Sequence, residues 1–268
     1  MKELCADLRA EYDALGKVGV GLTPVRWQAE TDFYRWSVWD EIAHLLFFDE
    51  FAVIAVTDLS GFRRQQAQLE GRLLEGLQIS EITRQKYAGL SGAELVDRWS
   101  GVYDALVREL EVLEPRARLP WFGPDMSARS FATARLMETW AHGQDVHDAL
   151  GLSREPTQRL KHVAHIGVVT FHWSFQVRGL KAAVEAPAVT LRAPSGELWR
   201  WNENSRNGEV QGSALDFCLV VTQRRNVADT RLKAIGPVAS QWLSIAQCFA
   251  GPPAEGPAPG SHPVVSVA

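Results

Sequence analysis

The sequence predicts an α+β protein in which a bundle of long helices, residues 1–180, precedes a small α+β domain, residues 186–250. Two observations predict this division. Apolar residues recur at helical spacing in several long stretches before residue 180. After residue 186 the stretches AVTLRA and ELWRWN alternate as strands do and flank the turn PSG. The final segment, 251–268, is rich in Pro, Gly, Ala and Ser, and we expect it to be a disordered tail.

The composition limits the classes of protein to which the chain can belong. With 46% hydrophobic residues it can bury a sizeable core, and its net charge is −4. A nucleic acid or an anionic membrane would require a basic face, so neither partner is expected. No apolar run reaches the length of a membrane-spanning helix. The longest, residues 42–56, is interrupted by His44, Asp49 and Glu50. The N-terminus lacks a signal-peptide core and the three cysteines are widely spread, so a cytoplasmic location is expected.

The first half of the predicted bundle contains two long helices and a polar segment. Residues 2–16 form the first helix. Ser37 and Asp40 have the spacing of a capping box that opens a second helix, which runs to about residue 57 and is apolar on most sides. Residues 60–88 are polar and helical, and we expect them to form an outer layer or a lid.

Two further helices complete the predicted bundle. The third, 92–113, follows another capping box, and the fourth contains Arg135–Leu150 and ends before Gly151. The Pro- and Gly-rich segment between them is expected to be a structured loop. Because loops that feed a rigid helix often edge a pocket, this loop should place Trp121 near any site. Another long helix is expected over 156–178.

The small domain continues after the hairpin with four more elements. GEVQG is a short third strand and SALDFCLVVTQRR an amphipathic helix. TRLKAIG indicates a further strand, and PVASQWLSIAQCFA a closing helix.

The candidate site lies on the second and fourth predicted helices. Glu138 and His142 are four residues apart and therefore share a helix face, with Asp145 one turn later. This spacing alone is more typical of a solvated polar stripe than of a metal site. His44, however, lies inside the apolar second helix, where a histidine is either a satisfied core residue or a ligand. If the helices converge, His44, Glu138 and His142 form a three-ligand metal site with an open position, as in catalytic zinc sites.

The chain resembles the mycothiol-dependent maleylpyruvate isomerase family through the motifs WDEIAHLLFFDE and ARLMETWAHGQDVHDALG. The C-terminal segment beginning VQGSALDFCLVVTQRR is similar to the sterol-carrier-like domain of the family. The resemblance implies a DinB-like four-helix bundle, zinc at His44, Glu138 and His142, and an arginine of the second domain that lines the site. That arginine would be Arg224 or Arg225, whose other role is to complement the end of a helix.

The resemblance also implies an activity. Similar proteins include thiol S-transferases that act on small molecules, among them thiol-exchange enzymes of lincosamide antibiotic assembly. We therefore expect a zinc-dependent enzyme in which mycothiol attacks a small-molecule electrophile. Asp145 would orient a ligand imidazole or act as a base, Arg224 and Arg225 would bind a carboxylate, and Trp121 would line the cofactor pocket.

The sequence is also compatible with other activities and with more than one oligomeric state. The alternatives are a cis-trans isomerase of the maleylpyruvate type, a metal-dependent hydrolase, and a non-catalytic protein whose second domain binds an apolar ligand. No cysteine is needed as the nucleophile, because Cys5 is expected at a frayed terminus and the other two cysteines in packing positions. A monomer or a homodimer is expected.

Overall fold

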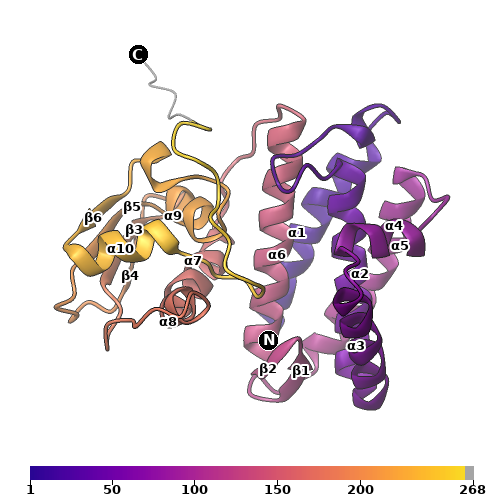
Figure 1. Ribbon diagram of the computed structural model, residues 1–268, viewed down its shortest axis with the longest axis horizontal. Helices are drawn as coiled ribbons and strands as arrows, with labels where there is room; N and C mark the ends of the chain where they lie inside the picture. Colours follow the sequence, from indigo (N-terminus) through magenta and orange to yellow (C-terminus); the bar gives the residue numbers. More distant parts are fainter. Residues whose placement is uncertain (263–268) are drawn as a thin grey trace. The chain divides into compact units, whose positions relative to one another are not determined.

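The computed structural model describes residues 1–262 and consists of two compact units, one spanning Met1–Arg154 and one that begins at Glu155. The first unit is helical, and the second contains a mixed sheet with helices (Figure 1). The predicted α+β class is therefore confirmed. Within the described residues, no helix is both long enough and apolar enough to cross a membrane.

Four long helices form the frame of the first unit (Figure 1). They are α1 (Lys2–Val20), α2 (Val38–Thr57), α5 (Gly92–Glu111) and α6 (Ala128–Ala149). Helix α1 contacts α5 and α6, and α2 contacts the same two helices, so the four close into a ring. Side chains such as Leu8, Leu46, Trp99 and Leu136 are fully buried between them. Burial of this apolar surface is the main stabilising contribution to the bundle.

Helix α2 begins where the sequence predicts. The Ser37 side chain accepts a hydrogen bond from the Asp40 backbone, and Asp40 accepts one from the Ser37 backbone, which is a complete capping box. Asp40 also forms an ion pair with Arg84, at 2.7 Å from Nη2. The polar segment after α2 forms α3 (Leu59–Leu74) and α4 (Ile79–Lys86), and both pack against α2.

The segment before α6 is a hairpin rather than the loop that the sequence predicts. Strands β1 (Arg118–Trp121) and β2 (Gly123–Ser127) pair antiparallel, with a register shift between Leu119 and Trp121. The strands are short and contain Pro and Gly, so they show no alternating pattern that would identify them.

The second unit contains a four-stranded sheet in the order β4-β3-β5-β6. Strands β3 (Ala188–Arg192) and β4 (Leu198–Trp201) form the predicted hairpin, and β5 (Glu209–Ser213) pairs parallel to β3 and antiparallel to β6 (Lys233–Ile235). The helices of this unit are α7 (Leu160–Val169), α8 (Phe171–Gln176), α9 (Ala214–Val221) and α10 (Pro237–Ile245).

The boundary between the units falls at 154/155, before α7, whereas the sequence places it between 180 and 186. The predicted helix over 156–178 is two helices that belong to the second unit. Helix α7 packs against α9 through Gly167, where a methyl group would lie 2.7 Å from Val221 Cγ2. This close approach ties α7 to the small sheet domain.

The expected tail, 251–268, follows a defined path as far as residue 262. It has no helix or strand over 251–262, yet the Gln247 side chain accepts from the Ala254 backbone and Asp229 accepts from the Gly260 backbone. The remainder of the predicted tail, 263–268, lies outside the described residues.

The start of α5 provides a test of packing in the bundle. Gly92 lies against the Trp27 indole, and a methyl group there would lie 2.0 Å from Trp27 Cε2. Because Trp27 is 4% exposed, we expect Gly92→Ala to lower the free energy of unfolding by about 1–3 kcal/mol. Gly101 on the same helix faces open space, so Gly101→Ala is expected to raise it by about 0.5–1 kcal/mol. Urea denaturation measures both, and equal effects would contradict the packing argument.

Candidate metal centre

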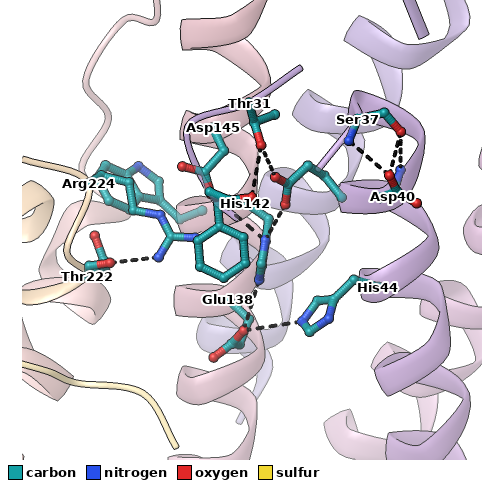
Figure 2. Close-up of polar contacts among 12 residues, drawn as sticks. Thr31, Ser37, Asp40, His44, Glu138, His142, Asp145, Thr222 and Arg224 are labelled. Atoms are coloured by element: carbon teal, nitrogen blue, oxygen red, sulfur yellow. Dashed lines mark hydrogen bonds and ion pairs between the residues drawn. The ribbon is translucent and has the colours of Figure 1, made fainter. Parts of the chain in front are cut away.

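Helices α2 and α6 bring the three predicted ligands together (Figure 2). Glu138 Oε2 lies 3.4 Å from His142 Nε2 and 3.8 Å from His44 Nε2. Two ligand atoms that are each about 2.0–2.1 Å from a tetrahedral zinc ion lie about 3.3 Å apart. The ligand atoms of the three residues all lie within 4.8 Å of one another, and this spacing and the two-imidazole, one-carboxylate donor set fit a divalent metal.

His142 is oriented by a carboxylate on the opposite helix. Its Nδ1 lies 2.6 Å from Oε2 of Glu41, a fully buried residue of α2, and the other Glu41 oxygen accepts from the Thr31 hydroxyl at 2.7 Å. A hydrogen bond from Nδ1 to Glu41 leaves the lone pair of His142 on Nε2, which faces Glu138. This carboxylate–histidine arrangement fixes the tautomer and the ring orientation of metal-binding histidines.

Glu41 makes the contact with His142 that the sequence analysis expects of Asp145. The Asp145 carboxylate is buried beside His142, but its Oδ2 lies 3.9 Å from Nδ1, beyond hydrogen-bond distance. Glu41 is therefore the hydrogen-bond partner of His142 Nδ1, and the role of Asp145 in orienting a ligand imidazole or acting as a base stays a prediction. The available signal was a glutamate inside the apolar second helix, three residues before His44.

The electrostatics of the three residues suit ligation. Burial, together with the neighbouring His142, lowers the pKa of His44 to about 3, so its imidazole is neutral at physiological pH. Burial by itself would raise the pKa of Glu138. Interactions with His142 and His44, and then the charge of Arg135, nevertheless hold that pKa well below its usual range. A neutral imidazole and an ionised carboxylate are the forms that bind metals.

A short loop before α2 places two aromatic rings against the ligand histidines. The Phe33 ring meets His142 edge-on with centroids 5.1 Å apart, and Trp36 lies 5.2 Å from His44. Between them Tyr34 and Arg35 have φ values of 51° and 58°, a left-handed conformation that is rare for residues other than glycine. Backbone strain of this kind is common where a loop is held for function.

A second aromatic group also contacts His44. Phe48 packs 4.8 Å from the His44 ring and 6.3 Å from Trp121, which itself is 9% exposed and packs edge-on against Phe131. Trp121 is thus one ring removed from His44. Its assignment to a cofactor pocket stays a prediction.

Arg224 and Arg225 belong to the second unit, where they follow α9. Gln223 has a left-handed φ of 59°, and both following backbone N–H groups donate to the carbonyl of Leu219. The Arg224 guanidinium is buried and donates to the Thr222 carbonyl at 2.6 Å. These contacts give both residues a role at the end of α9, and their catalytic role stays a prediction.

The cysteines are buried. Cys5 is 1% exposed inside α1, so it does not lie at a frayed terminus, and Cys218 and Cys248 are packed in the second unit. Burial raises the pKa of the Cys218 thiol well above its usual range. A buried thiol of this kind is a poor nucleophile.

Comparisons with known proteins agree with the fold. The chain is 43% identical over 251 residues to an uncharacterised protein of Mycobacterium tuberculosis (strain ATCC 25618 / H37Rv). The aligned region covers 94% of this chain and 96% of the relative. Among solved structures it is similar to the mycothiol-dependent maleylpyruvate isomerase, with a TM-score of 0.55, 14% identity, and coverage of 87% of this chain and 92% of that one. A mutant of that isomerase gives a TM-score of 0.53 and 13% identity, with coverage of 84% and 89%.

The fold and the site define a helical-bundle protein with a candidate His₂Glu metal centre, followed by a mixed-sheet domain. Residues 8–147 match the family model described as the mycothiol maleylpyruvate isomerase N-terminal domain. The chain belongs to this family.

Proposed function

We propose that the protein is a zinc-dependent enzyme that uses a low-molecular-weight thiol, mycothiol, to transfer or exchange sulfur on a small-molecule electrophile. The observation that carries this proposal is the three-residue cluster of His44, Glu138 and His142 on two rigid helices. Catalytic zinc sites have three protein ligands and keep a further position open for substrate. When bound, zinc would lower the pKa of a thiol in that position.

The residues of the chain hold the reacting groups in place. Glu41 and Thr31 fix the His142 ring, while Phe33 and Trp36 cover the two imidazoles and restrict water. The thiolate sulfur forms a bond to the electrophilic carbon, the leaving group departs with its bonding electrons, and the thiol proton is released to solvent. The buried positions of the cysteines favour an external thiol over a cysteine of the chain.

A cis-trans isomerase is the second candidate. It is favoured by the family name and by the fold of the similar isomerase, whose printed name includes mycothiol dependence. In that reaction the thiol adds to the substrate and leaves again, so no conjugate accumulates. A role in lincosamide-type antibiotic assembly rests on the sequence resemblance alone and remains part of the transferase proposal.

Cobalt substitution tests the use of a thiol directly. We expect titration of the cobalt-loaded protein with mycothiol to produce a saturable near-ultraviolet band, because a thiolate bound to cobalt absorbs there. S-methylated mycothiol, which cannot form a thiolate, is the matched control and should give no band. If mycothiol gives no band at any pH, a metal-dependent hydrolase becomes the better assignment. Mass spectrometry of the products then separates transfer, which leaves a conjugate, from isomerisation, which does not.

A further inference from the structure

A polar pocket lies beside the start of α2. Its volume is about 310 Å³, which is at the lower end of the range of about 300–1,000 Å³ that small-molecule sites occupy. The residues that line it include Gln28, Glu30, Arg35, Trp39, Asp40 and Arg84. Although the structure describes all three candidate metal ligands, none of them lines this pocket.

The Arg84 guanidinium is held firmly in this pocket by a buried carboxylate. Its Nε and Nη2 atoms donate to the two oxygens of Asp40 at 2.7 Å each. Asp40 is 1% exposed and also accepts from the backbone and the hydroxyl of Ser37 (Figure 2). Arg84 Nη1 makes no hydrogen bond to the described residues, so one edge of the fixed guanidinium is free to donate.

A second ion pair lines the same pocket. Arg35 has a left-handed backbone with a φ of 58°, and its Nη2 lies 2.9 Å and 3.0 Å from the two oxygens of Glu30. Each Glu30 oxygen keeps a lone pair, and the Arg35 Nε and Nη1 donors have no partner among the described residues. The Gln28 side chain makes no hydrogen bond with any described residue, so its amide can both donate and accept.

The charges that line the pocket cancel. Two guanidinium groups and two carboxylate groups are present, and they form the two ion pairs just described. An anion in the pocket would meet the Glu30 carboxylate, and a cation would meet two guanidinium groups, so neither sign of charge is favoured. The free donors and acceptors lie together instead. Hydroxyl groups suit this mixed set, because each hydroxyl both donates and accepts.

An indole ring provides the apolar part of the pocket. Trp39 Nε1 donates to the Leu90 carbonyl at 3.2 Å, so the polar atom of the ring is already used. The remaining indole surface is apolar, and its face carries partial negative charge. Sugars and cyclitols have hydroxyl groups around the edge of a ring and C–H groups on its faces. Such a ring therefore matches both the polar and the aromatic parts of the pocket.

We propose that this pocket binds a neutral polyhydroxylated ring, either a monosaccharide or a cyclitol. Neighbouring hydroxyls accept from the free guanidinium edges of Arg35 and Arg84 and donate to Glu30. The C–H face of the ring packs on the Trp39 indole, and the small volume limits the ligand to about one ring. This inference goes beyond the proposed function and does not rest on it, since the pocket contains no candidate metal ligand.

A titration followed by nuclear magnetic resonance tests the pocket. The probes are methyl glucoside, methyl galactoside, methyl mannoside and myo-inositol, each added to nitrogen-15-labelled protein. The signal to follow is the Trp39 indole N–H, which is identified by its loss in Trp39→Phe. We expect at least one probe to shift this signal saturably and to the same extent in metal-free and zinc-loaded protein. Cyclohexanol, which has the ring but a single hydroxyl, should give no shift.

Two variants and a matched control connect binding to the pocket. Arg84→Lys keeps a positive charge beside Asp40 but loses the free guanidinium edge, so it should weaken binding by about tenfold or more. Gln28→Ala removes an exposed side chain that supports no other contact, and it should weaken binding by about threefold or more even if Arg84→Lys is unstable. Arg63→Lys is the control, because Arg63 pairs with Asp125 and does not line the pocket. It should leave binding unchanged.

Several results would overturn the inference. These are no saturable shift with any of the four probes, an equal response to cyclohexanol, and unchanged binding in both pocket variants. Tighter binding of inorganic phosphate than of all four probes would also overturn it, because the pocket would then be an anion site. Loss of zinc binding in the ligand variants, with sugar or cyclitol binding retained, would show that the two sites are independent.

Discussion

Replacing His142 with alanine is expected to abolish tight binding of a divalent metal. The substitution removes one of three candidate ligands, and it also leaves the Glu41 carboxylate buried with Thr31 as its remaining side-chain donor among the described residues. Loss of a buried partner of this kind costs about 3–5 kcal/mol of stability. Metal content by elemental analysis after dialysis, together with the melting temperature of the metal-free protein, measures the two effects.

His44→Ala removes a second ligand with a smaller effect on the metal-free fold. The Nδ1 atom of His44 is buried and has no hydrogen-bond partner within residues 1–262, and its Nε2 lies 3.8 Å from Glu138 Oε2, so the substitution removes a weaker contact than the one between His142 and Glu41. Metal should be lost while most of the stability is kept. His147→Ala is the matched control on α6, because His147 bonds to the Gly143 carbonyl and lies outside the three-residue cluster. Full metal occupancy in both ligand variants would show that the cluster is not a metal site.

The second large effect is expected from Glu41→Gln. Glutamine keeps the size of the side chain but removes the charge that the His142 Nδ1–H faces at 2.6 Å. Loss of such a partner of a ligand histidine typically lowers metal affinity by about 10–100-fold. Burial raises the pKa of Glu41 to about 6, against the opposing effect of the His142 hydrogen bond. The carboxylate is thus ionised at pH 8, where the comparison should be made.

Asp145→Asn is the comparison for this variant. Asp145 is buried on the same side of His142, but its oxygen is 3.9 Å from Nδ1. We expect its metal affinity, measured by competition with a chelator of known affinity, to stay within a few-fold of the unaltered protein. A larger loss in Asp145→Asn than in Glu41→Gln would restore Asp145 as the residue that orients the histidine.

The helices were predictable because their signals are local. Capping boxes at Ser37 and Ser91, and apolar residues at helical spacing, identify α2 and α5 within a few residues of their observed ends. The hairpin before α6 was missed, because its strands are too short and too rich in Pro and Gly to show a period. The unit boundary was also placed late, since helical spacing does not reveal which neighbour α7 packs against.

The candidate ligands were identified by two kinds of information. The spacing of Glu138 and His142 shows that they share a helix face, and His44 is a histidine inside the apolar second helix. The family resemblance then implies that the three residues hold zinc. Spacing alone did not distinguish this pair from a solvated polar stripe. The structure places the three side chains within ligand distance of one another, which spacing on separate helices cannot establish.

The sequence by itself determined the helical bundle, the two helices that carry His44 and His142, and the strands that follow residue 186. Only the tertiary structure decided that Glu41 contacts His142 Nδ1, and that Arg135 pairs with Asp49 across the bundle. The reason is geometric. Periodicity fixes which residues share one face of one helix, whereas contacts across the bundle depend on how each helix is rotated and how far it is shifted along its neighbours.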